Sequence, residues 1–390
     1  MLAGSAVVGQ KSALVGELRQ AKYADVLAAH PSIRLLLGEA RLRPDGAVEV
    51  DGRHVPARKV LLATGASPAV PTIPGLSDTP FLTSTSVMEL DRLPEHLIVL
   101  GGGYVGLELG QAFRRFGARV TVLARSGLLR GEEPEIVAQL AGHLRDEGLA
   151  VHAGLEVERV QGETGRIQVV VREGGTTHTV EGDRLLVATG RRPNSGGMGL
   201  EEAGVTLGDR GQVVVDEHLR TSHPDIYAAG DVIGDPAFVY VAAYAGRLAA
   251  DNALGEGPRA YDVSVVPRVT FTDPAVAAVG MTEAEARGRG QEVVTSLLPM
   301  AHVPRAIAAR DTRGLVKLVA DGRTNLLLGA HILAPEAGDI IQEAVLAIRF
   351  GLRVRDLASV FHPYLTNAEA FKLACQGFEK DVATLSCCAA

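Results

Sequence analysis

The stretch Leu97-Ile98-Val99-Leu100-Gly101-Gly102-Gly103-Tyr104-Val105-Gly106 decides the fold. Its apolar run predicts a buried strand, and Gly101, Gly103 and Gly106 follow directly with the spacing Gly-x-Gly-x-x-Gly. A helical pattern continues to about Phe116, and Arg119-Val120-Thr121-Val122-Leu123 supplies a second strand. This order is typical of a dinucleotide-binding unit, because the glycines allow a tight turn, close approach of a pyrophosphate and close helix-sheet packing.

The nucleotide preference follows from the end of the second strand. In such a unit the pyrophosphate of the dinucleotide lies at the helix N-terminus; the alternative is that the glycine-rich turn is purely structural and binds no ligand. NAD sites usually carry an acid about 20 residues after the glycines, whereas Ala124-Arg125 stands there. An acid would repel a 2′-phosphate and Arg125 would bind it, with Arg130 as a second candidate, so the sequence predicts NADP(H). Ordinary solvated arginines are the alternative, chiefly for Arg130.

One short motif occurs twice. Residues 59–65 and 184–190 each read as a buried strand that ends in Ala-Thr-Gly, with a proline three residues later. Two strands that end in the same motif predict two related sheet domains, unless the motif recurs by chance. A third apolar run ends at Gly230-Asp231. A plain turn would explain this ending alone, but after the other motifs it fits a flavin site in which Asp231 accepts a hydrogen bond from a ribityl hydroxyl.

Length, charge and cysteine content limit the class of protein. The 390 residues are enough for two or three domains. A net charge of −7 without a basic cluster gives no footprint for nucleic acid or an anionic membrane. We expect no membrane span and no signal peptide, because no apolar run approaches ~18–20 residues and the first residues lack a basic region. Three cysteines predict reduced thiols and a cytoplasmic protein.

Two of the cysteines are adjacent, in the terminal stretch Leu385-Ser386-Cys387-Cys388. Adjacent cysteines form only a strained disulfide, but they can offer two thiolates to one soft metal ion. The sequence therefore predicts Cys387 and Cys388 as metal ligands, with an inert terminal tail as the alternative.

The segment Phe361-His362-Pro363-Tyr364-Leu365-Thr366-Asn367-Ala368-Glu369, the helix 370–378 and the terminal cysteines follow the nucleotide motifs in order. Together they resemble the mercury(II) reductase branch of the flavin-dependent pyridine nucleotide-disulfide oxidoreductases, the family of glutathione reductase and lipoamide dehydrogenase. The resemblance covers essentially the whole chain. It implies a homodimeric enzyme that uses NADPH and FAD to reduce Hg(II) to Hg(0), and whose terminal thiols take Hg(II) from thiol complexes and pass it to the partner subunit.

The resemblance also implies roles for single residues. Tyr364 stands five residues before Glu369, where the glutathione and lipoamide enzymes have a catalytic His and mercury reductases have Tyr. A phenol shuttles protons poorly at neutral pH but can donate to a thiolate or lie beside a metal; an interface aromatic without a chemical role is the alternative. Tyr104 resembles the lid over the flavin, or is a core aromatic. Glu108 resembles the Glu that pairs with a Lys near the flavin, or is a solvated carboxylate.

The remaining assignments are contacts to FAD and two structural side chains. His362 is expected to be structural, because its spacing to Glu369 is wrong for the family's His-Glu pair. Cys375 is expected to be a small core residue. The resemblance implies FAD contacts at Ala40, Thr64, Gly65, Gly230, Asp231 and Val239.

The resemblance predicts an α/β fold with two Rossmann-like domains, the first incomplete, and an α+β dimerisation domain. The expected segments are 1–78 (FAD remnant), 79–197 (NADP), 198–259 (FAD return) and 260–390 (dimerisation and tail). From residue 260 onward we expect strands at 269–272 and 314–319 and helices near 338–350 and 367–378.

The family's first Gly-x-Gly-x-x-Gly and its Cys-x4-Cys pair do not occur in the sequence. We therefore expect a member that starts late, through a truncated gene, a misplaced start codon or a partial chain, and that cannot turn over Hg(II) as written. A general NADPH-dependent disulfide reductase is one alternative, although it predicts His in place of Tyr364 and no terminal thiol pair. A non-catalytic metal-binding or dimerisation module is the other.

Overall fold

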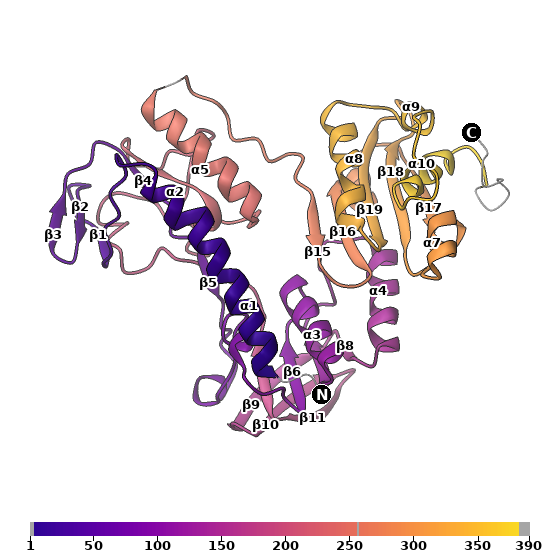
Figure 1. The fold of residues 1–390 in the computed structure, drawn as a ribbon, viewed down its shortest axis with the longest axis horizontal. Coiled ribbons are helices and arrows are strands. Elements are labelled where there is room, and N and C mark those ends of the chain that lie inside the picture. The colour runs from indigo at the N-terminus through magenta and orange to yellow at the C-terminus, as the bar shows by residue number, and fades with distance from the viewer. Residues whose placement is uncertain (1–3, 256, 382–390) are drawn as a thin grey trace. The chain divides into compact units, whose positions relative to one another are not determined.

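The computed structural model describes residues 4–255 and 257–381. The chain mixes helices and sheets (Figure 1), as the sequence predicts for an α/β fold, and it divides into two compact units. The first unit comprises Met1–Val70, Thr85–Arg92 and Gly190–Val263, and the second comprises Pro71–Ser84, Leu93–Thr189 and Ser264–Ala390. The division into segments that end at residues 78, 197 and 259 stays a prediction.

The first unit is built from short sheets and two long helices. Strand β4 pairs in parallel with β14, and β5 pairs antiparallel with β13. Helix α5 packs on β4 and β14. The elements are α1 (Gly4–Arg19), the π-helix η1 (Gln20–Ala24), α2 (Asp25–Ala28), β1 (Ala40–Leu42), β2 (Val48–Val50), β3 (Arg53–Val55), β4 (Val60–Leu62), β5 (Ala66–Pro68), η3 (Ser86–Glu89), β13 (Arg191–Pro193), β14 (Ile226–Ala228), η4 (Gly230–Ile233) and α5 (Val239–Leu254).

The first half of the second unit is the nucleotide-binding sheet. Four parallel strands run in the order β12-β6-β7-β8, and a separate antiparallel sheet has the order β11-β10-β9. The elements are η2 (Leu76–Asp78), β6 (His96–Leu100), α3 (Tyr104–Phe116), β7 (Arg119–Ala124), α4 (Pro134–Asp146), β8 (Ala150–Ala153), β9 (Glu156–Glu163), β10 (Arg166–Glu173), β11 (Thr176–Gly182) and β12 (Arg184–Val187). The predicted strand, helix, strand order is confirmed as β6, α3 and β7.

The second half of this unit is a five-stranded antiparallel sheet in the order β15-β16-β19-β18-β17. Helix α8 packs on β16 and β19, and α10 packs on β17 and β18 (Figure 1). The elements are β15 (Arg268–Thr270), β16 (Ala275–Gly280), α6 (Glu283–Gly288), β17 (Val293–Pro299), η5 (Met300–His302), α7 (Pro304–Ala309), β18 (Leu315–Asp321), β19 (Leu327–Ala334), α8 (Ala337–Arg349), α9 (Val354–Ala358) and α10 (Glu369–Gln376). They confirm both predicted strands and both predicted helices.

The repeated Ala-Thr-Gly motif marks two different sheets. The strand before its first copy is β4 in the first unit, and the strand before its second copy is β12 in the second unit. The residues after the two copies, β5 and β13, pair with each other in the first unit. The two strands thus lie in different units, and the relatedness of two sheet domains stays a prediction. No helix in the described ranges is both long and apolar enough to cross a bilayer.

Candidate functional site

The glycine-rich turn after β6 has the geometry that a dinucleotide site needs. A Cβ atom at Gly101 would lie 2.2 Å from the carbonyl oxygen of Ala188, and one at Gly106 would lie 2.3 Å from that of Gly101. Both positions therefore exclude a side chain. At Gly103, the N-cap of α3, a Cβ would meet no atom within 4 Å. The backbone at the start of α3 is thus open to an approaching phosphate, which helix N-termini favour.

Two arginines follow the second strand of this unit. Arg125 comes directly after β7, and both Arg125 and Arg130 are exposed. Neither guanidinium has a hydrogen-bond or ion-pair partner among the residues that the structure describes. Because a guanidinium donates well to phosphate oxygens, both side chains could bind a phosphate group of a pyridine nucleotide.

Tyr104 and Glu108 lie on the first turns of α3. Glu108 is half-buried, and its carboxylate accepts a hydrogen bond from the backbone N–H of Phe271 at 2.8 Å. Burial raises the pKa of this carboxyl group, although the bond from Phe271 opposes the rise. Glu108 is therefore more than a solvated helix carboxylate, and it joins α3 to the segment after β15. Tyr104 stays partly exposed at the first position of α3.

The residues assigned to the flavin lie in the first unit. Thr64 and Asn194 bond to each other: the Thr64 hydroxyl donates to the Asn194 carbonyl (2.6 Å), and the Asn194 amide donates to the Thr64 carbonyl (2.9 Å). Gly65 follows in the left-handed region, with φ of +68°. The carboxylate of Asp231 lies 3.4 Å from Nε of Arg191 and keeps part of its surface exposed. It is thus oriented by a cation and can still accept a hydrogen bond from a ligand hydroxyl.

The other residues assigned to flavin contacts lie at the starts of helices or strands. Gly230 and Asp231 open a four-residue 3-10 helix, η4, and α5 begins only at Val239. Val239 is exposed, and Ala40 is the first residue of β1. The structure brings Thr64, Gly65, Gly230, Asp231 and Ala40 into one unit, because β4 and β14 are parallel neighbours there.

His362 is buried and held through both ring nitrogens, as expected of a structural residue, and its partner is one that the sequence did not reveal. Nε2 of His362 lies 2.9 and 3.0 Å from the two carboxylate oxygens of Glu343, on α8, and Nδ1 lies 3.0 Å from the carbonyl oxygen of Val360. The side chain is 5% exposed. The hydrogen bond with Glu343 raises the pKa of His362, although burial opposes it. Glu343 and His362 are only 19 residues apart in the sequence, but no local motif indicates that they form a pair.

Tyr364 and Glu369 occupy different environments. Tyr364 is 55% exposed. Glu369 is the first residue of α10, and within the described part of the chain nothing donates to its buried Oε2. Cys375 is fully buried in the core of the C-terminal sheet, as predicted, and burial raises the pKa of its thiol. The predicted metal ligands Cys387 and Cys388 lie outside the described residues.

Comparison with known proteins identifies the family. Residues 4–246 match the family model of the pyridine nucleotide-disulphide oxidoreductases, and residues 266–375 match the dimerisation domain of the same family. The chain belongs to this family. The second match supports a homodimer, and the first implies a flavin and a pyridine nucleotide as cofactors.

The chain is also similar to proteins named mercuric reductase. It is 49% identical over 389 residues to the one from Streptomyces lividans, 46% over 384 residues to the one from Bacillus cereus and 45% over 381 residues to the one from Staphylococcus aureus. These matches cover 97–98% of this chain and 82%, 61% and 70% of those proteins, respectively. The chain thus spans roughly two thirds of the length of some of its relatives.

Solved structures support the same placement. The HOCl-induced flavoprotein disulfide reductase RclA from Escherichia coli matches with a TM-score of 0.87 at 33% identity, over 95% of this chain and 85% of that one. The chain is therefore a mercuric reductase-like flavoprotein oxidoreductase in both sequence and fold.

Proposed function

We propose that this protein is of the type that reduces Hg(II) to Hg(0) with NADPH and with FAD as the flavin, and that residues 1–390 carry the NADPH and Hg(II) sites but lack the Cys-x4-Cys pair that turnover needs. The observation that carries the proposal is its identity of 43–49% with proteins named mercuric reductase over nearly the whole chain. Thiol chemistry of this kind needs a reducing compartment, so we place the reaction in the cytoplasm.

NADPH is assigned to the turn between β6 and α3. The open backbone at Gly103 would bind the pyrophosphate, and Arg125 and Arg130 would bind the 2′-phosphate. FAD, when bound, passes the electrons of the nicotinamide on to thiols. Asp231, oriented by Arg191, would accept from a ribityl hydroxyl. Tyr104 would cover the flavin until the nicotinamide enters.

Hg(II) is assigned to the terminal thiols. Cys387 and Cys388 would exchange with the thiols that carry Hg(II) and hold it as a dithiolate, because soft thiolates prefer a soft ion. They would then pass it to the partner subunit, with the phenol of Tyr364 beside its path. The chain has three cysteines and no Cys-x4-Cys pair. We therefore propose that residues 1–390 bind NADPH and Hg(II) without turning Hg(II) over.

Calorimetric titration with Hg(II) in a competing thiol buffer tests the assignment. The Cys387→Ala, Cys388→Ala double variant should lose one tight equivalent per chain, whereas Cys375→Ala should bind as the parent does because Cys375 is buried. Equal stoichiometry in parent and double variant would contradict the metal site. Robust Hg(II)-dependent oxidation of NADPH by residues 1–390 with added FAD would contradict the proposed lack of turnover.

A further inference from the structure

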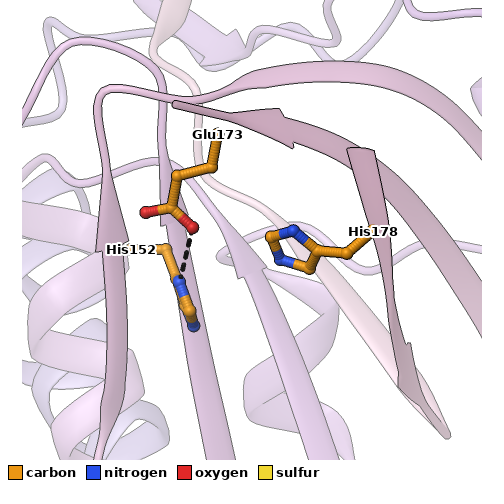
Figure 2. Close-up of side chains that lie close together, drawn as sticks. All are labelled: His152, Glu173 and His178. Carbon is orange, nitrogen blue, oxygen red and sulfur yellow. Dashed lines mark hydrogen bonds and ion pairs between the residues drawn. The ribbon is translucent and has the colours of Figure 1, made fainter. Parts of the chain in front are cut away.

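Three potential metal ligands meet in the second unit, and none of them is among the residues assigned above. Figure 2 shows His152 of β8, Glu173 at the end of β10 and His178 of β11 pointing toward one another. One ligand atom from each lies within 4.8 Å of the others. Nδ1 of His152 is 3.1 Å from Oε2 of Glu173, and the two imidazole centroids are 6.1 Å apart.

The hairpin β10-β11 positions two of these side chains. Gly174 and Gly175 have φ of +56° and +83°, which suits a two-residue hairpin turn. Glu173 pairs with Thr176, and His178 pairs with Val171, two residues before Glu173. Glu173 and His178 are therefore diagonal neighbours on one face of the hairpin, which brings long side chains within reach of each other.

The third ligand comes from a different sheet. His152 belongs to β8, the edge strand of the four-stranded parallel sheet, whereas the hairpin belongs to the three-stranded antiparallel one. His152 is 34% and Glu173 36% exposed, so an ion can enter and water can complete its coordination. Two imidazoles and a carboxylate with open positions are a ligand set for divalent transition metals, Zn²⁺ among them.

The other cluster of potential ligands in the described residues differs because it already contains a cation of the protein. Glu133, Glu135 and Glu283 also lie close together, but all three carboxylates contact the ammonium group of Lys317. A cation of the protein already compensates their charge. Among the described residues, no Lys or Arg side chain contacts the cluster of His152, Glu173 and His178.

We propose that His152, Glu173 and His178 bind a divalent transition-metal ion, and that this ion fastens the β10-β11 hairpin to the edge of the parallel sheet. The site is separate from the proposed Hg(II) site, because it uses nitrogen and oxygen ligands and lies on the nucleotide-binding half of the chain. Its role is structural: it joins two sheets that no shared ladder connects.

Calorimetric titration with Zn²⁺ tests the site. The full chain with Cys387→Ser and Cys388→Ser serves as the parent, because thiolates would compete for Zn²⁺. We expect the parent to bind one Zn²⁺ per chain. The affinity for Zn²⁺ should be at least about tenfold lower in His178→Ala and in Glu173→Gln, because replacing residues that only hydrogen-bond to a metal ligand already lowers metal affinity about 10–100-fold. His302→Ala, which removes an exposed imidazole elsewhere in this unit, should bind as the parent does.

Thermal unfolding with and without Zn²⁺ adds a second measurement. At equal Zn²⁺ concentration, the Tm of the parent and of His302→Ala should rise more than that of the two ligand variants. If His178→Ala fails to fold, Glu173→Gln decides the question. Absence of Zn²⁺ binding in the parent, or equal affinity in the parent and the ligand variants, overturns the proposal, and neither result bears on Hg(II) binding by the tail.

Discussion

Replacement of Lys317 by methionine tests the buried charge cluster that joins the two halves of the second unit. Lys317 lies on β18 with 3% of its side chain exposed, and its Nζ is 2.9 Å from Glu133, 2.8 Å from Glu135 and 2.9 Å from Glu283. Burial alone would lower the pKa of Lys317, but hydrogen bonds to the three carboxylates raise it instead. The side chain is therefore charged, and methionine keeps its apolar stem while removing the charge.

The expected loss follows from the burial of the partners. Glu133 is 2% exposed and would become a buried carboxylate without its cation, whereas Glu135 and Glu283 are 41% and 29% exposed and can be hydrated. Removing one partner of a buried ion pair costs about 3–5 kcal/mol. Glu133 keeps one bond from the backbone N–H of Glu283, at 2.6 Å. We therefore expect the free energy of unfolding to fall by about 3 kcal/mol, the lower end of that range.

A matched substitution separates burial from charge. Lys59→Met removes the cation of an exposed pair, whose Nζ lies 2.6 Å from Asp225; exposed pairs contribute about 0–1 kcal/mol. Adding Glu133→Gln to Lys317→Met should restore part of the loss, because it removes the uncompensated charge.

Urea denaturation followed by far-UV circular dichroism measures these free energies by linear extrapolation. Equal losses in Lys317→Met and Lys59→Met would refute the reasoning. So would a further loss, in place of a recovery, on adding Glu133→Gln.

The other predictions concern the nucleotide site and a buried histidine. Arg125→Ala should shrink the ratio of the NADH to the NADPH dissociation constant about tenfold to a hundredfold, because a charge-assisted hydrogen bond contributes about 1.5–3 kcal/mol; an unchanged ratio in a fluorescence titration rejects the assignment. Gly106→Ala should lower the Tm and abolish NADPH binding, since its Cβ would lie 2.3 Å from a carbonyl oxygen, whereas Gly103→Ala, which meets no atom, should keep the Tm and lose only NADPH affinity. The pKa of His362 is raised by Glu343, so the stability that this pair contributes is fully present below the ordinary histidine pKa of about 6.5 and is lost as the pH rises through the higher native value. His362→Asn should therefore destabilise the protein more at about pH 5.5 than at about pH 9 in urea denaturation, and an equal effect at both would contradict this.

The sequence predicted the elements whose formation depends on local pattern. The run from Leu97 to Gly106 specified β6, the turn and α3, because an apolar strand and a fixed glycine spacing are both local. The same holds for the helices α8 and α10, whose apolar residues recur on one face. By contrast, β11 was not predicted, because no residue of this strand is fully buried and its alternation of exposed and half-buried side chains carries little apolar signal.

The clusters escaped prediction because folding brings their members together. Lys317 and Glu133 are 184 residues apart, and His152 and Glu173 lie on strands of different sheets. Neither spacing resembles a motif. The resemblance to a family gave the positions of Tyr364 and Asp231, but not that Glu343 bonds to His362 or that Arg191 orients Asp231.

The environment of His362 bears on which chemistry the C-terminal motif can support. Its two ring nitrogens contact a carbonyl oxygen and a carboxylate, both of which accept hydrogen bonds, so both nitrogens are already engaged by groups of the protein. Neither nitrogen can therefore exchange a proton with a thiol without giving up one of these contacts.

Tyr364, two residues later, is exposed, but a phenol, with a pKa near 10, gives up its proton poorly at neutral pH. Cleavage of a disulfide yields thiolates that a neighbouring acid must protonate, whereas two electrons added to a dithiolate-bound Hg(II) release Hg(0) and two thiolates without a proton. Because both ring nitrogens of His362 are engaged by Val360 and Glu343 and the phenol of Tyr364 is a weak acid, neither side chain is suited to protonate a cleaved disulfide, which favours the proposed reduction of a metal ion over a general disulfide reductase.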